Sequence, residues 1–486
     1  MASVIERTVK GGAGFFTANV IRRGLGFLFV VVATRVLGPA EFGVLALGLS
    51  VMGVVRRVAA FGLPKTIQRF MSGEGEDRSA QLYGTILLTG SVSAVLAGTA
   101  LYVASPELAL IFEQPSLAGP LRVLSFVVVV AVGFSLLRSL LQAQERVRWI
   151  VVVDTARSAA KVGLLCLLFL GVQSATSAAW AVAGAFGTAL ALAGSYVRKL
   201  DFRPSFDALA TDARTVLSYS APLVVVGFSY FLSQQTDRLM LGWLADASSV
   251  GIYTVTSKLA MSISTFRGAL ISIFMPVASA AFRNEATQQM RRSYLFIGKW
   301  GGVASGAALL IFTGAGPWLL QLFGVEYATN TTYRVLVVLS GLYFIGAWVG
   351  PTGALLQMSD GHRVELVNTI VFIVANVTLN YVLITAYGVI GAAVATLLSG
   401  LLRNAIQVCE IAYWYGITPF APNNLAVLGI TGIGTAGLML MTAGLARMGL
   451  ALGSVLVLGA YVLWTATGDE WDSIQKLMSG AKMAVR

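Results

Sequence analysis

The chain has 486 residues, of which 57% are hydrophobic and only 12% charged, and its mean hydropathy is +0.79. Soluble domains carry about 25% charged residues, so this composition excludes a soluble protein and indicates a polytopic membrane protein. We interpret the net charge of +12 as a topology signal and not as affinity for nucleic acid, because the charges between hydrophobic segments lie on one side.

Fourteen apolar segments follow one another along the chain, each close to the roughly 20 residues that a membrane-spanning helix needs. They are expected near residues 15–37, 42–63, 80–104, 117–143, 150–171, 176–197, 216–243, 250–277, 300–322, 333–357, 364–385, 390–414, 425–445 and 450–467. Gly and Pro mark the gaps between them, as at Gly38-Pro39. These segments leave no room for an extramembrane catalytic domain, so we expect a protein that is not an enzyme.

Lys and Arg are distributed very unevenly over the gaps between these segments. The gaps on the side of the N-terminus hold nineteen of them, and the gaps on the other side hold only Arg447. The positive-inside rule therefore predicts that both termini lie in the cytoplasm, in a multi-pass protein of the cell membrane. An even number of spans agrees with this orientation.

Cysteine and histidine are too few to suggest a cofactor. Cys166 and Cys409 both fall in apolar spans, so we expect two buried thiols with no disulfide and no metal site. The single histidine, His362, lies in a polar loop and is interpreted as a solvated residue. We expect no cofactor.

The first six spans resemble the second six, which predicts an internal repeat. Thr34–Gly38 is echoed by Asp237–Gly242, Phe42-Gly43-Val44 by Val250-Gly251-Ile252, Leu140-Leu141-Gln142 by Leu355-Leu356-Gln357, and Arg146 by Arg363, at offsets of 203 to 217 residues. Because six is even, both halves share one orientation in a parallel repeat, a type that places a binding site between two lobes. We expect an N-lobe at 1–200, a C-lobe at 201–415, and two further spans with a cytoplasmic tail at 416–486.

Basic residues inside the expected spans are the most informative candidates for a binding site. Fourteen Lys and Arg lie there, against the four acids Asp154, Asp237, Glu365 and Glu410. An arginine at the bilayer centre costs about 2.5–3.5 kcal/mol even on a lenient scale. So many basic residues within the spans indicate a water-filled cavity that binds an anionic ligand.

Two pairs of adjacent arginines are expected at similar depth near the cytoplasmic side of the first two spans. Arg22 and Arg23 lie on one span, and Arg56 and Arg57 on the next. Adjacent helix residues point about 100° apart, so we expect one of each pair to face the cavity, where its planar fork suits phosphate oxygens. The alternative is that these side chains reach the cytoplasmic headgroups.

The remaining candidates lie on later spans. Asp154, Arg157 and Lys161 share one helix face, which we expect to contribute to the binding cavity. Because Asp154 and Arg157 can pair with each other, the alternative is a structural stripe whose charges neutralise one another. Arg267 is preferred to Lys258 for the cavity because it is deeper. Asp154, Asp237, Arg238 and Lys258 are candidates for coupling or gating. For Asp237 and Arg238 the structural alternative is a local ion pair at the end of the helix. Asn376 and Asn380 lie on one side of a span with Asn368, where they either touch sugar hydroxyls or join helices by hydrogen bonds.

Several motifs resemble the polysaccharide transporter family of the multidrug/oligosaccharidyl-lipid/polysaccharide exporter superfamily, which includes the Wzx-type flippases. The motifs are Arg35-Val-Leu-Gly-Pro-Ala-Glu-Phe-Gly43, Asp237-Arg-Leu-Met-Leu-Gly242, Val250–Leu259, Leu322–Tyr327 and Gly388–Thr396. The resemblance implies an exporter fold of the MATE-like type, with two six-helix lobes and two extra C-terminal helices. It also implies alternating-access transport of a polyprenyl-phosphate- or diphosphate-linked oligosaccharide from the cytoplasmic to the outer leaflet.

Two other functions remain open from the sequence. A cation-coupled multidrug exporter of the same superfamily would need an intramembrane carboxylate, and the first two spans contain none. A membrane-embedded glycosyltransferase would need acidic or nucleophilic residues on a sizeable outer loop, whereas the outer gaps are short. The expected partners are the lipid-linked oligosaccharide and membrane lipids, and the oligomeric state cannot be predicted.

Overall fold

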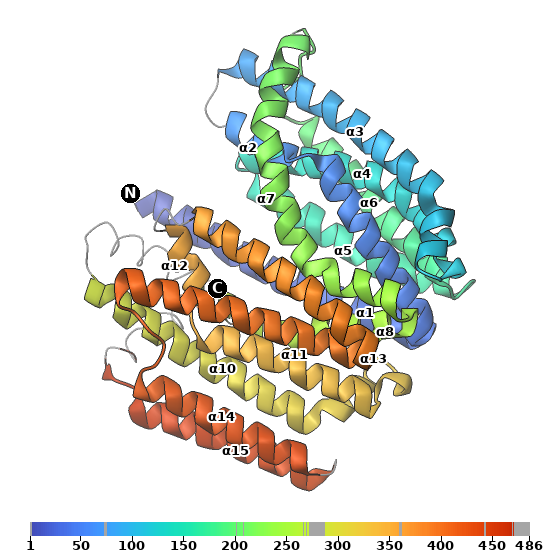
Figure 1. The fold of residues 1–486 in the computed structure, drawn as a ribbon. Helices are drawn as coiled ribbons and strands as arrows, with labels where there is room; N and C mark the ends of the chain where they lie inside the picture. The colour runs from blue at the N-terminus through green and yellow to red at the C-terminus, as the bar shows by residue number, and fades with distance from the viewer. Residues whose placement is uncertain are drawn as a thin grey trace. The chain divides into compact units, whose positions relative to one another are not determined.

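The computed structural model describes residues 2–71, 75–200, 202–207, 209–265, 267–268, 270–271, 287–358, 362–441, 444–468 and 470. Within these ranges the chain is helical and contains no strand (Figure 1). Its helices form two compact units, Met1–Gly251 and Ile252–Gln475. The all-helical fold class predicted from the sequence is confirmed.

The first unit contains seven α-helices in the described part of the chain and begins an eighth. They are α1 (Ala2–Ala60), α2 (Leu63–Phe70), α3 (Glu76–Ile111), α4 (Ala118–Ala143), α5 (Val147–Phe169), α6 (Ala175–Val197) and α7 (Leu209–Leu244), with a 3₁₀ turn η1 (Pro115–Leu117) before α4. The boundary between the units falls within α8 (Ala247–Ser262). The second unit continues with α10 (Thr287–Gln321), η2 (Val325–Tyr327), α11 (Asn330–Trp348), α12 (Thr352–Met358), α13 (His362–Tyr415), α14 (Pro422–Leu440) and α15 (Leu445–Thr465).

The expected membrane spans lie on helices for most of their length where the structure describes them. Nine helices of the described part are long and apolar enough to cross a membrane, which agrees with a multi-span membrane protein, while the number of fourteen spans stays a prediction. The end of the eighth expected span, beyond residue 271, and the tail from 471 to 486 lie outside the described residues.

Within α1 and within α13, a glycine with non-helical backbone angles separates two helices that correspond to two expected spans. Gly38 has φ 68° inside α1 and is followed by Pro39, and Gly388 has φ 56° inside α13. A positive φ is accessible to glycine at little cost, and proline cannot donate its backbone nitrogen to the preceding turn. At each of the gaps that the sequence predicted, two helices therefore meet at the glycine without a longer loop between them.

Other details differ from the sequence-based expectation. The span expected at 333–357 is interrupted between α11 and α12, where Gly350 has φ 95° and Pro351 follows. Cys166 and Cys409 are free and exposed, so the prediction of two buried thiols is wrong. In a membrane protein an apolar residue can face lipid, so apolar surroundings in the sequence do not imply burial within the protein.

Helices α4, α5 and α6 form a packed part of the first unit that carries several of its expected intramembrane charges. The helices α5 and α6 pack along each other, and both contact α4. Phe134, Leu141, Ile150, Val153, Ala189 and Ala193 form a buried core between them. This core holds α5, and with it Asp154 and Arg157, in a fixed position beside α1.

The second unit is organised around α10. Figure 1 shows α14 and α15 as a hairpin beside α10, and both pack against it. The hairpin is fixed by polar contacts as well as apolar ones. The indole nitrogen of Trp348 donates to the carbonyl of Asn424 at 2.7 Å, and buried Arg447 donates to the hydroxyl of Tyr333.

The lobe boundaries at 200/201 and 415/416 stay a prediction, because packing alone does not report which helices belong to one sequence repeat. Helix α7, which the sequence assigns to the C-lobe, packs against α1, α2 and α3 and falls in the first compact unit.

Candidate functional site

A cavity of about 250 Å³ lies in the first unit and has three cationic side chains in its wall. It is lined by Arg56, Arg57, Ala60, Gly62, Pro64, Lys65, Ser135, Leu223, Val224, Gly227 and Phe228. The cations come from the end of α1 and the start of α2, and the apolar side chains come from α7. A cationic rim on an apolar wall suits an amphipathic anion such as a lipid phosphate.

The turn between α1 and α2 positions the cations. Gly62 adopts φ 70° as the N-cap of α2, and a β-carbon there would lie 2.8 Å from the carbonyl oxygen of Ser220 on α7. Glycine is therefore required both by the backbone conformation and by the close approach of α7. The turn brings Lys65 to the same cavity as Arg56 and Arg57.

Arg56 and Arg57 are held differently. The Arg57 guanidinium lies 4.7 Å from the centroid of the Phe231 ring, a favourable cation–π distance. Within the described residues, Arg56 has no ion-pair partner, and its electrostatic neighbours are the like charges Arg57 and Arg157. Both residues line the cavity, whereas the sequence predicted that one of them would do so. Arg56 is thus a half-buried cation for which an anionic ligand would supply the missing counter-charge.

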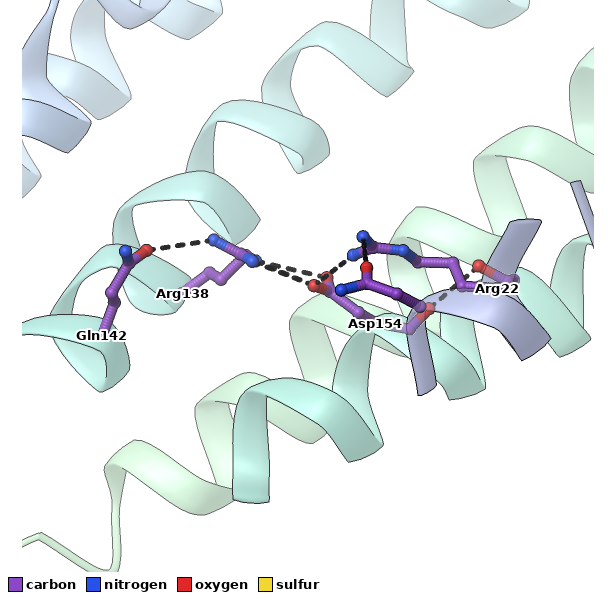
Figure 2. A network of polar contacts seen from close by, with 6 residues as sticks. Arg22, Arg138, Gln142 and Asp154 are labelled. Atoms are coloured by element: carbon purple, nitrogen blue, oxygen red, sulfur yellow. Dashed lines mark hydrogen bonds and ion pairs between the residues drawn. The ribbon is translucent and has the colours of Figure 1, made fainter. Parts of the chain in front are cut away.

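A single carboxylate joins three helices next to this region (Figure 2). Asp154 Oδ2 on α5 lies 3.0 Å from Arg22 Nη1 on α1 and 3.0 Å from Arg138 Nη2 on α4. Arg138 also donates to Gln142 at 3.3 Å, and Arg22 donates to Asn19. Asp154 therefore binds two arginines of other helices in place of the pair with Arg157 that the sequence suggested. A small cavity of about 10 Å³ beside Arg22 and Asp154 has room for roughly one water molecule.

The other two cations of the α5 face point at aromatic rings. The Arg157 guanidinium lies 5.1 Å from the Phe186 centroid and 5.8 Å from the Phe134 centroid. Lys161 Nζ lies 3.4 Å from the Phe29 centroid. Rings stabilise these charges without neutralising them, so the cluster keeps an excess of positive charge. Arg23, the neighbour of Arg22, is exposed.

In the second unit the predicted residues are less closely grouped. Arg267 is half-buried and donates from Nη2 to the carbonyl of Gly350 at 3.2 Å, while Lys258 is exposed. Asn376 and Asn380 are 1% and 0% exposed. Asn380 donates to Asn376 at 3.0 Å, and Asn376 donates to Ser399 at 3.3 Å. These bonds favour the helix-joining alternative for the two asparagines in this structure.

Asp237 and Arg238 lie near the end of α7 in the first unit. Asp237 is 6% exposed, and Arg238 Nη1 donates to Gln235 Oε1 at 2.9 Å. The same oxygen accepts from Ser50 Oγ of α1 at 2.9 Å. This region therefore joins α7 to α1 through a shared amide.

Three residues were not selected from the sequence as site candidates. Lys65 and Ser135 line the cationic cavity, and Arg138 pairs with Asp154. A signal for Arg138 was present, because it and Asp154 lie at equal distances from residue 146, where α4 turns into α5. Residues at equal distances from the turn of a helical hairpin lie at about the same height, so their side chains can meet if both point inward. The second unit contains another unselected network, in which Glu365 binds Arg403 and accepts from Gln407 at 2.8 Å.

The described helices combine multiple candidate membrane spans with a cationic cavity, an arrangement typical of a membrane transport protein. Residues 8–282 match the model of the polysaccharide biosynthesis protein family, and the chain belongs to this family. The family resemblance inferred from the sequence motifs is thereby confirmed.

Two relatives illustrate the family. The probable low-salt glycan biosynthesis flippase Agl15 of Haloferax volcanii is 26% identical over 411 residues, covering 83% of each chain. The lipopolysaccharide biosynthesis protein WzxC of Escherichia coli is 23% identical over 361 residues, covering 73% of this chain and 70% of its own. The first of these relatives is a probable flippase, in agreement with the prediction that the chain is not an enzyme.

Solved structures share the fold. The inward closed conformation of the lipid II flippase MurJ matches with a TM-score of 0.73 and 13% identity, covering 92% of this chain and 98% of that chain. An inward-facing multidrug transporter of the MATE family matches with a TM-score of 0.67 and 14% identity, covering 88% of this chain and 100% of that chain. At these identities the similarity concerns the fold alone, and it confirms the exporter fold that the sequence predicted.

Proposed function

We propose that this protein is a flippase that moves a lipid-linked oligosaccharide, carried on a polyprenyl phosphate or diphosphate, from the cytoplasmic to the outer leaflet by alternating access. The observation that carries the proposal is the cavity of the first unit, where Arg56 lacks a described counter-ion beside Arg57 and Lys65. Membership of the polysaccharide biosynthesis family and the flippase relatives support the same function.

The chemistry of the cavity supports a phosphate as the bound group. A guanidinium in a water-poor site costs several kilocalories per mole unless an anion binds it. Arginine presents parallel donors that match two phosphate oxygens, and Lys65 adds a point charge. In our proposal Arg56, Arg57 and Lys65 bind the phosphate, and Leu223, Val224 and Phe228 contact the apolar part of the lipid.

The other predicted residues keep a place in the proposal. Arg22, Arg23, Arg157, Lys161 and Arg267 remain candidates for contact with the phosphate or glycan, and Asn376 and Asn380 for contact with sugar hydroxyls after release of their present hydrogen bonds. Asp154, Asp237, Arg238 and Lys258 remain candidates for coupling or gating.

The function is tested by removing the protein from cells that depend on it. A lipid-linked oligosaccharide should accumulate on the cytoplasmic leaflet, protected in intact cells from an impermeant glycosidase, and re-expression should restore its exposure. Unchanged exposure of the glycan would contradict the flippase. Loss of export of a cationic dye in the same cells would favour the multidrug exporter of the same superfamily.

The proposed orientation places the turn at Glu145 in the cytoplasm and the turn at Glu113 outside. Both residues are exposed between helices. In a background of Cys166→Ser and Cys409→Ser, we expect Glu113→Cys to react with an impermeant thiol reagent in intact cells and Glu145→Cys to react only after lysis. The reverse pattern would invert the topology.

The contact between α2–α3 and α7 is proposed to open during transport. Thr66 Oγ1 and Ser220 Oγ are 2.7 Å apart, and the ion pair of Arg78 and Asp212 measures 2.7 Å. Polar contacts of this kind separate more readily than an apolar core, because water replaces the hydrogen bonds. The sequence repeat assigns α7 to the second half while it packs on helices of the first, as expected for a contact that alternates.

A disulfide between α2 and α7 tests this step. The two hydroxyl oxygens are close enough for cysteines to form a bond of about 2.0 Å after a small adjustment. We expect oxidised Thr66→Cys/Ser220→Cys protein to lose flipping and to regain it on reduction, while each single cysteine variant stays active. Full activity of the cross-linked protein would show that these helices do not separate.

A further inference from the structure

Two aromatic rings stack at the end of the α5–α6 hairpin in the first unit. Trp149 lies in the first turn of α5 and Tyr196 near the end of α6. Their ring centroids are 4.9 Å apart and their planes differ by 16°. Both rings are half-buried at the edge of the core formed by Ile150, Val153 and their neighbours. The stack is therefore fixed by the packing of the hairpin and keeps an open side.

One cation lies near each ring of the stack. The Arg146 guanidinium lies 5.5 Å from the Trp149 centroid, and Lys199 Nζ lies 5.6 Å from the Tyr196 centroid. Arg148 and Arg198 are exposed beside them. We call Arg146, Arg148, Trp149, Tyr196, Arg198 and Lys199 the basic–aromatic cluster.

The four cations have no carboxylate partner within the described part of the chain. Glu145 is adjacent to Arg146 and is itself exposed. Like charges held together by packed helices repel each other, and a bound anion relieves this repulsion. The arrangement therefore favours an anionic ligand that also contacts aromatic surface.

We propose that the basic–aromatic cluster binds the headgroup of an anionic phospholipid. Tryptophan and tyrosine favour the headgroup depth of a bilayer because one part of each ring is apolar and another polar. Basic groups at the same depth attract anionic lipids. The adjacent surface of α5 is apolar, with Val147 43% and Val152 40% exposed, and offers a contact for an acyl chain.

This site is distinct from the cationic cavity, since the two share no residue. A soluble anion would use the charges but gain nothing from the rings or from the apolar surface of α5. The cluster therefore fits a lipid headgroup better than free phosphate, and it does not depend on the flippase proposal.

The site is tested by native mass spectrometry of the purified full chain in detergent, titrated with phosphatidylglycerol or phosphatidylcholine. The variant Arg146→Gln/Lys199→Gln should bind phosphatidylglycerol about tenfold more weakly. Each basic group near an anionic headgroup contributes about 1 kcal/mol to binding, and about 1.4 kcal/mol corresponds to a tenfold change in affinity. Trp149→Ala should also weaken it, and binding of phosphatidylcholine should not change. Soluble glycerol phosphate should not displace the bound lipid at matched concentration.

A matched control separates this site from general attraction by positive charge. Arg291 and Arg292 are exposed on α10, and among the described residues no stacked aromatic pair lies beside them. The variant Arg291→Gln/Arg292→Gln therefore removes the same charge. We expect this control to bind phosphatidylglycerol as the wild type does. An equal loss in the control, or wild-type binding by both cluster variants with unchanged monodispersity, would overturn the proposal. Displacement by glycerol phosphate would also overturn it and would assign the cluster to soluble anions.

Discussion

Replacing Arg56 by glutamine should reduce flipping by about ten- to a hundredfold, because a hydrogen bond to a charged group contributes about 1.5–3 kcal/mol. The folded protein should be at least as stable as the wild type, since the variant removes a half-buried cation whose electrostatic neighbours include Arg57 and Arg157. The measurement is the rate of lipid-linked oligosaccharide exposure, together with the thermal unfolding of purified protein.

Two further variants distinguish a binding role from a structural one. Arg56→Lys keeps the charge but not the planar fork, and should therefore flip at an intermediate rate. Arg292→Gln removes an exposed cation of α10 and should leave both flipping and stability unchanged. If Arg56→Gln lowers stability and leaves flipping intact, Arg56 is a structural residue and the cavity does not hold the phosphate.

Replacing Asp154 by asparagine should destabilise the first unit by about 2–4 kcal/mol, because it leaves the two arginines of its network without their shared carboxylate. Asp154 has an 8% exposed side chain, and Arg22 and Arg138 are 34% and 30% exposed, so the effect is smaller than for a fully buried pair. Thermal or denaturant unfolding of the purified protein in detergent measures this loss.

A second substitution tests the mechanism of that loss. In Arg138→Gln/Asp154→Asn one unpaired cation is also removed, so part of the stability should return. Glu145→Gln changes an exposed carboxylate of the adjacent turn and should have little effect. If Asp154→Asn is as stable as the wild type but no longer flips, Asp154 acts in coupling, as its sequence position also allows.

The lengths of the apolar segments and the glycines between them determined the fold class from the sequence alone. A long apolar segment has few alternatives to a helix in a membrane, because each backbone group must find its partner within the same segment. The breaks at Gly38 and Gly388 were predictable for a similar reason, since their backbone conformations favour glycine. The clustering of basic residues on the first, second and fifth expected spans likewise indicated an anionic guest.

The tertiary structure decided how the charges are partnered. Asp154 has Arg157 within reach on its own helix, but the packing of α1, α4 and α5 brings Arg22 and Arg138 to the carboxylate. Which arginine pairs with the carboxylate depends on the distances between helices. The spacing of residues along one helix does not give these distances. The same packing places Lys65 and Ser135 in the wall of the cavity beside Arg56. It also exposes Cys166 and Cys409, because whether an apolar helix face meets lipid or protein depends on its neighbours.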